Sequence, residues 1–402
     1  MARRLLVAQL GARRHYAIPR LLHAEGMLET LHTDVCATRG WPRWLAAAIP
    51  RPLRPASIRR MADRNPQDIP SSRIRSHDWV GLWNHLRRRR ARSAERRALV
   101  DLSCRMEFAK AVAREGLGEA DAVYTFDGAG LEILELARRE GAPGILDQCI
   151  AARSSVVEIL EREREAFPDL GSNLVADPGG RIAERERAEW SVADVVVCGS
   201  EFVKETIRAS GGPVEKVVVA PSGVDAARFA PLKRNPPRRP LRVLFVGEVG
   251  LRKGAHYLIE AARELEPTGL TCRLVGAIQF REGYLARAPA NVRFCGALPR
   301  SEIAEHYEWA DLFCFPSLCE GSALVTYEAL SKGLPVVTTP NAGSVVQDGV
   351  DGYLIPPRDT SAIVAAIERF AREGLPESAG ESPPKFSLDA YRRRLKPIVE
   401  SL

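Results

Sequence analysis

The stretch Asp311–Thr339 constrains the fold of this chain more than any other part of the sequence. It opens with an apolar run, Leu312–Phe315, that predicts a buried strand. After a short loop, apolar residues recur at helical spacing up to Gly333, and Leu334–Thr338 predicts the next strand. The residues at helical spacing are Ala323, Leu324, Tyr327 and Leu330. A strand, a loop, a helix and a strand in this order predict an α/β domain.

This unit carries two carboxylates, Glu320 in the loop and Glu328 in the predicted helix. A helix that begins near Ser322 would point its free N–H groups and its positive end at the loop, where an anion such as a diphosphate can bind. A carboxylate accepts two hydrogen bonds and suits a vicinal diol, which a ribose and a hexose each offer. Gly321 would let the backbone approach such a ligand closely.

At these residues the sequence resembles the retaining glycosyltransferases of family 4, which have the GT-B fold. The resemblance rests on the Glu-x7-Glu pattern of Glu320 and Glu328, followed by Gly333 and by Pro335–Val337. It implies an α/β fold of two doubly wound Rossmann-like domains that face an interdomain cleft. The C-terminal domain would bind a nucleotide-diphosphate sugar. The resemblance is closest over residues 195–359.

The loop that follows the predicted strand Val243–Val246 holds two adjacent cations, Arg252 and Lys253, which can meet a diphosphate. In the family this loop commonly reads Gly-Arg, a short gap and Lys-Gly. Here Glu248 stands in place of that arginine, and we infer that Arg252 supplies the cation. The resemblance implies that Glu320 holds the sugar hydroxyls beside these cations. The donor-binding residues that it implies are Glu328, Gly247, Gly321, Ser322, Ala323, Leu324, Gly296 and Gly11.

The first half of the chain predicts a second α/β domain, because the strand Leu5–Leu10 is closed by Gly11 and followed by a helix. Gly11 either lets the backbone approach a substrate or makes a plain turn. Polar residues follow two later strands, and they are candidates for the acceptor side or else turn and cap residues. These candidates are Asp127, Asp147 and Gln148. Many family members place a histidine at the second of these strand ends, and this sequence has none there.

The sequence divides into two domains around residues 231–240, a proline-rich basic segment that predicts a stiff linker. We expect an N-terminal acceptor-side domain over 1–230 and a nucleotide-sugar-binding domain over 241–385. Residues 386–402 predict a helix that can pack back on the first domain. Residues 36–105 interrupt the α/β alternation and predict an irregular basic insertion.

Four of the six tryptophans lie in this insertion, beside arginines and leucines. Aromatic rings and cations together suit the interface of an anionic membrane, so residues 41–97 predict a peripheral membrane contact. The alternative is a solvated basic helix whose tryptophans pack inward. The four residues are Trp41, Trp44, Trp79 and Trp83. The formal net charge of +7 favours anionic partners, but no nucleic-acid-binding signature is present, and we expect no nucleic-acid partner.

Eight scattered cysteines without a C-x-x-C pair indicate a reducing cytosol rather than a zinc site or a disulfide framework. No apolar run approaches the ~20 residues that span a bilayer. We therefore expect a cytoplasmic protein, with peripheral contact at the inner face of the cytoplasmic membrane. The chain has no acidic D-x-D cluster, and since the predicted cations can neutralise a diphosphate, we expect neither a metal nor a cofactor.

The resemblance implies a hexosyltransferase that moves a sugar, with retention, from a nucleotide-diphosphate sugar to a saccharide or a lipid-linked acceptor. Two alternatives stay open. One is a catalytically silent nucleotide-sugar-binding subunit, which the single Gly11 and the absent histidine motivate. The other is a nucleotide-sugar epimerase of the same fold. The sequence does not identify the sugar, the nucleobase or the acceptor.

Overall fold

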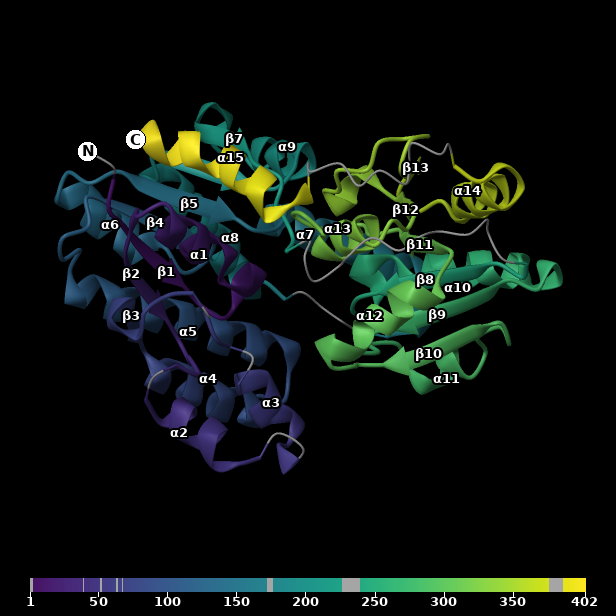
Figure 1. Cartoon of the computed structure of the whole chain (residues 1–402), viewed down its shortest axis with the longest axis horizontal. Helices are drawn as coiled ribbons and strands as arrows, with labels where there is room; N and C mark the ends of the chain where they lie inside the picture. The colour runs from purple at the N-terminus through teal and green to yellow at the C-terminus, as the bar shows by residue number, and fades with distance from the viewer. Residues whose placement is uncertain are drawn as a thin grey trace.

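The computed structural model describes residues 3–38, 40–50, 53–62, 64–66, 68–171, 176–225, 239–375 and 386–402. Within these residues the chain forms two parallel sheets, each with helices packed against it (Figure 1). The predicted class, α/β with two doubly wound domains, is confirmed. No helix among these residues is long and apolar enough to cross a membrane.

The N-terminal sheet has seven parallel strands in the order β3-β2-β1-β4-β5-β6-β7. Every residue of β1, β4 and β5 is buried, as expected of a parallel sheet that is covered on both faces. The strand order reverses between β1 and β4, and the loops after two such strands part to leave room for a ligand. The strands are β1 (Leu5–Gln9), β2 (Leu28–Thr33), β3 (Ile74–Ser76), β4 (Ala122–Phe126), β5 (Gly144–Gln148), β6 (Val195–Cys198) and β7 (Val217–Val219).

The region that the sequence marks as an irregular insertion, 36–105, is largely helical. It also contains β3, which pairs with β2 and forms the edge of the sheet. Helices α2, α3 and α4 extend from one end of the domain, away from the second sheet (Figure 1). The helices of this domain are α1 (Ala17–Ala24), α2 (Gly40–Ala48), α3 (Ala56–Ala62), α4 (Asp78–Arg90), α5 (Ala94–Glu115), α6 (Leu131–Arg139), α7 (Arg153–Ala166), α8 (Arg181–Val192) and α9 (Glu201–Ala209).

The C-terminal sheet has six parallel strands in the order β10-β9-β8-β11-β12-β13. Its order reverses between β8 and β11, which places the loops after these two strands at the ligand-binding edge. The strands are β8 (Arg242–Val246), β9 (Thr271–Val275), β10 (Val292–Gly296), β11 (Leu312–Phe315), β12 (Val336–Thr338) and β13 (Gly352–Leu354). The helices are α10 (Ala255–Glu264), α11 (Glu282–Leu285), α12 (Arg300–Trp309), α13 (Leu324–Ser331) and α14 (Thr360–Glu373).

Two helices cross from one domain to the other. Helix α15 (Leu388–Glu400) lies along the N-terminal domain (Figure 1), where it contributes Tyr391, Leu395 and Val399 to the core. In the opposite direction, α7 packs against the core of the C-terminal domain. Its buried Glu163 accepts a hydrogen bond from the Tyr257 hydroxyl at 2.9 Å. Residues 231–238 of the predicted linker lie outside the described residues.

Candidate active site

The loops that follow β8 and β11 meet at the point where the strand order of the C-terminal sheet reverses. The backbone N–H of Leu318 donates to the carbonyl oxygen of Arg252 at 2.9 Å, and the Ser317 hydroxyl donates to the same oxygen at 3.2 Å. Gly254 allows this approach: its φ is +65°, and a Cβ there would lie 2.0 Å from the carbonyl oxygen of Pro316. The close packing of the two loops brings the predicted cations beside Glu320.

Glu320 is ion-paired with both Arg252 and Lys253. Arg252 also donates to the carbonyl oxygen of Cys319 at 3.1 Å, and the Lys253 ammonium lies 5.1 Å from the centroid of the Phe315 ring. Burial disfavours the charged form of Glu320, but Lys253 and Arg252 outweigh burial and hold the pKa of this carboxyl below its usual value. The three side chains therefore form one charged cluster. That Arg252 supplies the cation in place of the family's arginine stays a prediction.

Gly321 brings this loop against the N-terminal domain. A Cβ at Gly321 would lie 1.9 Å from the carbonyl oxygen of Cys149, directly after β5. On the other side of the contact, a Cβ at Gly199 would lie 2.6 Å from the Cβ of Ser322. The Ser322 hydroxyl also accepts a hydrogen bond from the backbone N–H of Ser222 at 3.2 Å. The loop that carries Glu320 thus lies at the junction of the two domains.

Helix α13 begins at Leu324, two residues later than the sequence predicts, and no side chain caps it. Ser322 does not cap the helix because its hydroxyl is bound to the Tyr327 hydroxyl at 2.6 Å. The N–H groups of the first turn therefore have no capping side chain. Glu328, one turn into α13, is buried with 8% of its surface exposed, and it accepts a hydrogen bond from the Tyr307 hydroxyl at 3.1 Å. Tyr307 thereby fixes the orientation of this carboxylate.

Two predicted glycines shape the edges of the same region. Gly247 ends β8, and its carbonyl oxygen would lie 1.7 Å from a Cβ at Gly276, so the loops after β8 and β9 also pack closely. Gly296 ends β10 with φ of +71° and open space around it. Glu248, which stands where the family has arginine, accepts a hydrogen bond from the Gln279 amide at 3.5 Å. Its negative charge also acts on Arg252 and Lys253.

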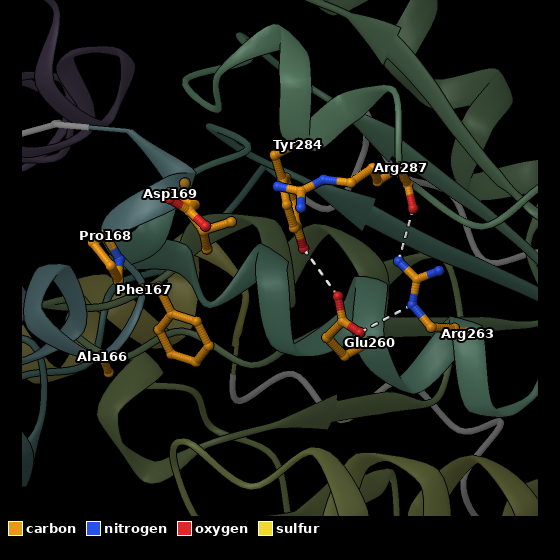
Figure 2. A pocket seen from close by; sticks show the side chains of 9 residues that line it. Ala166, Phe167, Pro168, Asp169, Glu260, Arg263, Tyr284 and Arg287 are labelled. Atoms are coloured by element: carbon orange, nitrogen blue, oxygen red, sulfur yellow. Dashed lines mark hydrogen bonds and ion pairs between the residues drawn. The ribbon is translucent and has the colours of Figure 1, made fainter.

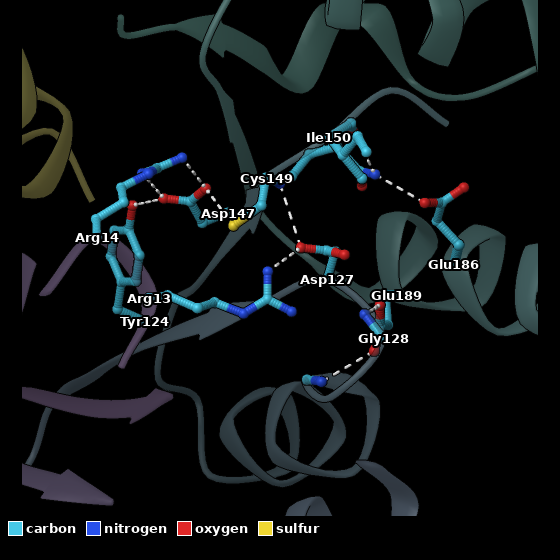
Figure 3. A network of polar contacts seen from close by, with 12 residues as sticks. Arg13, Arg14, Tyr124, Asp127, Gly128, Asp147, Cys149, Ile150, Glu186 and Glu189 are labelled. Carbon is cyan, nitrogen blue, oxygen red and sulfur yellow. Dashed lines mark hydrogen bonds and ion pairs between the residues drawn. The ribbon is translucent and has the colours of Figure 1, made fainter. Parts of the chain in front are cut away.

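The corresponding loops of the N-terminal sheet carry a second charged network (Figure 3). Arg13 donates a hydrogen bond to Asp127 at 3.0 Å. Arg14 donates hydrogen bonds to both carboxylate oxygens of Asp147, at 2.7 and 3.0 Å. Burial disfavours ionisation of Asp127, but Arg13, Arg105 and the hydrogen bonds from Cys149 together outweigh burial and lower the pKa of that carboxyl. Asp127 also accepts from the backbone N–H of Cys149 at 3.2 Å. Because Cys149 contacts Gly321, this network continues into the loop of Glu320.

Arg13 and Arg14 were not singled out as site residues by the sequence analysis. Arg14, His15 and Tyr16 are all left-handed, with φ of 47°, 52° and 59°, a conformation that costs on the order of 1–3 kcal/mol per residue and clusters at functional sites. The Gln9 amide supports the turn by donating to the carbonyl oxygens of Gly11 and Arg13. Two cations, two and three residues after the glycine of the first strand–turn–helix unit, are the signal that could have indicated this network.

The acceptor-side candidates differ in their surroundings. Asp127 is 8% exposed, whereas Asp147 and Gln148 are fully buried. Asp147 accepts a hydrogen bond from the Tyr124 hydroxyl at 2.7 Å, in addition to the arginine. The Gln148 amide accepts from Trp190 at 2.9 Å and donates to Glu186 at 2.7 Å. Asp127 is therefore the candidate with some access to solvent, and the other two lie beneath it.

Glu186 is expected to make folding depend on pH. Burial raises the pKa of this carboxyl to about 8, and the nearby charges of Asp127 and Glu189 add to the rise. Hydrogen bonds from the Arg153 N–H and from Gln148 lower the pKa but do not offset the effect of burial. In the unfolded chain this carboxyl has the ordinary glutamate pKa of 4.5. Between these values the unfolded state binds fewer protons, so the free energy of unfolding decreases as pH rises, by up to about 1.4 kcal/mol per pH unit.

The measurement compares urea unfolding of the wild type and Glu186→Gln across this pH interval. The substitution should remove part of the decline, because glutamine does not titrate. Two curves that stay parallel over the whole interval would contradict the assignment.

Two further groups lie away from this site. A cavity of about 300 Å³ is lined by the end of α7 and by α10 and α11 (Figure 2). Three of its polar side chains bind one another, since Tyr284 donates to Glu260 at 3.4 Å and Arg263 donates to Glu260 at 3.1 Å. Elsewhere, Nδ1 of His32 lies 3.1 Å from Nε2 of His77, the distance of a direct hydrogen bond between the two rings.

The C-terminal half of the chain is similar in sequence to proteins of a known family. The model of the family Glycosyl transferases group 1 matches residues 240–373. WcaL of Salmonella typhimurium, a glycosyltransferase with an inferred role in colanic acid biosynthesis, is 28% identical over 52% of this chain and 57% of its own length. The amylovoran biosynthesis glycosyltransferase AmsK of Erwinia amylovora is 31% identical over 43% of this chain and 46% of its own length. The chain thus spans about half the length of the curated relatives that it matches.

Solved structures resemble the whole chain. Sucrose-phosphate synthase from Thermosynechococcus elongatus has a TM-score of 0.67 at 18% identity, covering 100% of this chain and 99% of its own. HepE of Anabaena, solved in complex with UDP, has a TM-score of 0.62 at 16% identity and covers both chains completely. At this identity the likeness concerns the fold alone, which is GT-B. Residues 240–373 are thus similar to the group 1 glycosyl transferases, and the chain as a whole has the GT-B fold.

Proposed function

We propose that this protein is a metal-independent, retaining hexosyltransferase that uses a nucleotide-diphosphate sugar. The observation that carries the proposal is the cluster of Glu320, Arg252 and Lys253, held at the reversal point of the C-terminal sheet and against the N-terminal domain. A group 1 glycosyl transferase domain at residues 240–373 supports it. So do the structures of HepE with UDP and with UDP-glucose, which share the fold.

The donor would lie across the loops after β8 and β11. Arg252 and Lys253 would bind the diphosphate, together with the uncapped N–H groups of α13. Glu328, held by Tyr307, would accept hydrogen bonds from the ribose hydroxyls. Glu320 would hold the sugar hydroxyls, so that the anomeric carbon faces the N-terminal domain and Asp127.

In the reaction, the bond between the anomeric carbon and the diphosphate oxygen breaks while the acceptor oxygen bonds to the same face of the sugar. The acceptor proton passes to the departing phosphate oxygen, so the step needs no separate base. Arg252 and Lys253 would stabilise the charge that develops on the diphosphate, the task that a divalent cation performs in other transferases. Because the cations neutralise the diphosphate, we expect the reaction to need no metal. Because the departing phosphate takes the acceptor proton, the absence of a histidine at the end of β5 need not abolish activity.

Glu328→Ala is expected to raise the donor KM by about tenfold to thirtyfold with little change in kcat, because the ribose is bound alike in the ground state and the transition state. The measurement is steady-state kinetics with varied donor. Glu302→Ala, an exposed glutamate on α12, is the control and should behave as the wild type. An unchanged KM in Glu328→Ala would remove the ribose assignment.

The acceptor is proposed to be a saccharide or a lipid-linked saccharide, met in the cytoplasm and at the inner face of the cytoplasmic membrane. WcaL and AmsK, whose names place them in colanic acid and amylovoran biosynthesis, support an acceptor in polysaccharide assembly. The exposed tryptophans within residues 41–97 support the membrane contact. A thermal-shift panel of nucleotide sugars would identify the donor, since a ligand that binds only the folded state raises its Tm.

A catalytically silent subunit and an epimerase are the two competing functions. Glu248 in place of the family's arginine and the buried, fully engaged Gln148 favour the first of them. Incubation of the purified protein with its stabilising nucleotide sugar distinguishes all three. Release of nucleotide diphosphate supports transfer, an epimerised sugar without nucleotide release indicates an epimerase, and an unchanged donor indicates a silent subunit.

A further inference from the structure

Helix α4 carries an apolar stripe that the described chain leaves about half exposed. Trp79, Leu82, Trp83 and Leu86 stand at positions i, i+3, i+4 and i+7, which lie on one face of a helix. They are 45%, 44%, 49% and 40% exposed, respectively. In a helix that packs on its own protein, a stripe with this spacing faces the core. Here the core contact of the helix is made instead by Val80, which is fully buried.

Helix α2 repeats the pattern. Trp41, Trp44 and Leu45 stand at i, i+3 and i+4, and they are 42%, 76% and 36% exposed. Leu53, in the segment between α2 and α3, is 74% exposed. Two neighbouring helices thus present the same unpartnered spacing, which the accidental exposure of single residues does not explain.

The two stripes belong to one end of the N-terminal domain. The start of α2 adjoins the start of α4, because a Cβ at Gly40 would lie 2.4 Å from a carboxylate oxygen of Asp78. Among the described residues, the other large exposed hydrophobic side chains are Val218, Val350 and Leu354 alone. We call the eight clustered residues the tryptophan surface. They are Trp41, Trp44, Leu45, Leu53, Trp79, Leu82, Trp83 and Leu86.

Arginines border this surface. Arg87 and Arg88 pair with Glu107 and Asp101 of α5, which anchors the end of α4. Arg43, Arg89 and Arg90 are exposed and form no ion pair with any described residue. Two copies of this chain that met at the tryptophan surface would bring these cations together, which disfavours a second copy as the occupant. An anionic bilayer can bind both the apolar side chains and the arginines, because the rings lie at the depth of the headgroups and the cations contact lipid phosphates.

We propose that the tryptophan surface binds the anionic face of a lipid bilayer and holds the N-terminal domain there. This inference deepens the proposed function, because it names the surface where a lipid-linked acceptor would be met. It rests on residues of α2 and α4 and on none in the cluster of Glu320. The two proposals can therefore fail separately.

The test is flotation of the full chain with vesicles of phosphatidylcholine alone or with about 30% phosphatidylglycerol. We expect binding to the anionic vesicles at least about tenfold tighter than to neutral ones at about 0.1 M salt, with loss of this difference near 1 M. Equal affinity for both vesicles, or no binding to either, would overturn the proposal. Nucleotide-sugar binding is measured on the same samples, so failure of one proposal is seen independently of the other.

Variants locate the contact. Trp44→Ser/Trp83→Ser should weaken anionic-vesicle binding by at least about tenfold, and Arg89→Glu/Arg90→Glu should weaken it by about fivefold or more per residue. Val350→Ser/Leu354→Ser removes comparable exposed apolar groups elsewhere and should leave binding unchanged. Each variant must keep the wild-type Tm and nucleotide-sugar affinity. A dimer that the tryptophan variant dissociates, without vesicle binding by the wild type, would assign the surface to a second copy and refute the membrane proposal.

Discussion

Replacing Glu320 by glutamine is expected to lower kcat by about a thousandfold, in line with the loss of an electrostatic group that acts on the transition state. Glutamine keeps the size of the side chain but loses the charge that pairs with Arg252 and Lys253. In the unliganded protein this carboxylate competes with a diphosphate for the two cations. The nucleotide diphosphate should therefore bind Glu320→Gln as tightly as the wild type or more tightly.

The prediction is specific because kcat should fall while the affinity for the nucleotide stays the same or rises. Steady-state kinetics report kcat, and calorimetric titration reports the nucleotide Kd on the same preparation. A merely structural role of Glu320 would weaken nucleotide binding and turnover together. Glu282→Gln, a substitution at the start of α11 outside the cluster, is the control. A wild-type turnover in Glu320→Gln would remove Glu320 from the reaction.

The substitution Gly321→Ala, which adds one methyl group, is expected to have the second large effect on activity. Alanine there would place its Cβ 1.9 Å from the carbonyl oxygen of Cys149, a backbone atom that cannot rotate away. The loop of Glu320 must shift, or the two domains must separate, and either change misplaces the cluster relative to the acceptor side. A displacement of about 1 Å can cost a hundredfold in rate, and we expect a loss in kcat/KM of at least that size.

Gly199→Ala approaches the same contact from the N-terminal domain, since its Cβ would lie 2.6 Å from that of Ser322. It should reproduce the loss of activity without touching the donor domain. Gly283→Ala is the matched control, because a Cβ there meets nothing within 4 Å and its backbone has no left-handed φ. Small-angle scattering should show a larger radius of gyration if the domains separate. Activity at the wild-type level in both Gly199→Ala and Gly321→Ala would show that this contact is not needed for catalysis.

Much of the geometry of the candidate site in the C-terminal domain could be predicted because its signals are local. The strand β11 has the predicted bounds, Leu312–Phe315, since four apolar residues before a proline leave few alternatives. The convergence of Arg252 with Glu320 follows from topology, because the loops after β8 and β11 adjoin wherever a parallel sheet reverses its strand order. The start of α13 was missed by two residues, because Ser322 binds Tyr327 rather than the helix.

The N-terminal site could not be predicted to the same extent because its partners are far apart in sequence. Arg14 meets Asp147 and Tyr391, which lie 133 and 377 residues away, and no local pattern encodes such contacts. Whether the tryptophans are exposed could not be predicted from the sequence for the same reason. Spacing alone gives α4 an apolar stripe, but whether a stripe faces the core depends on how much apolar surface the neighbouring elements already cover.

The return of α15 to the first domain has a consequence for biosynthesis. Tyr391, Leu395 and Val399 fill a core that otherwise consists of segments made far earlier on the ribosome. The amino-terminal lobe therefore cannot complete its interior during translation until the entire carboxyl-terminal lobe has emerged, and until then the apolar side chains that α15 covers are open to chaperones.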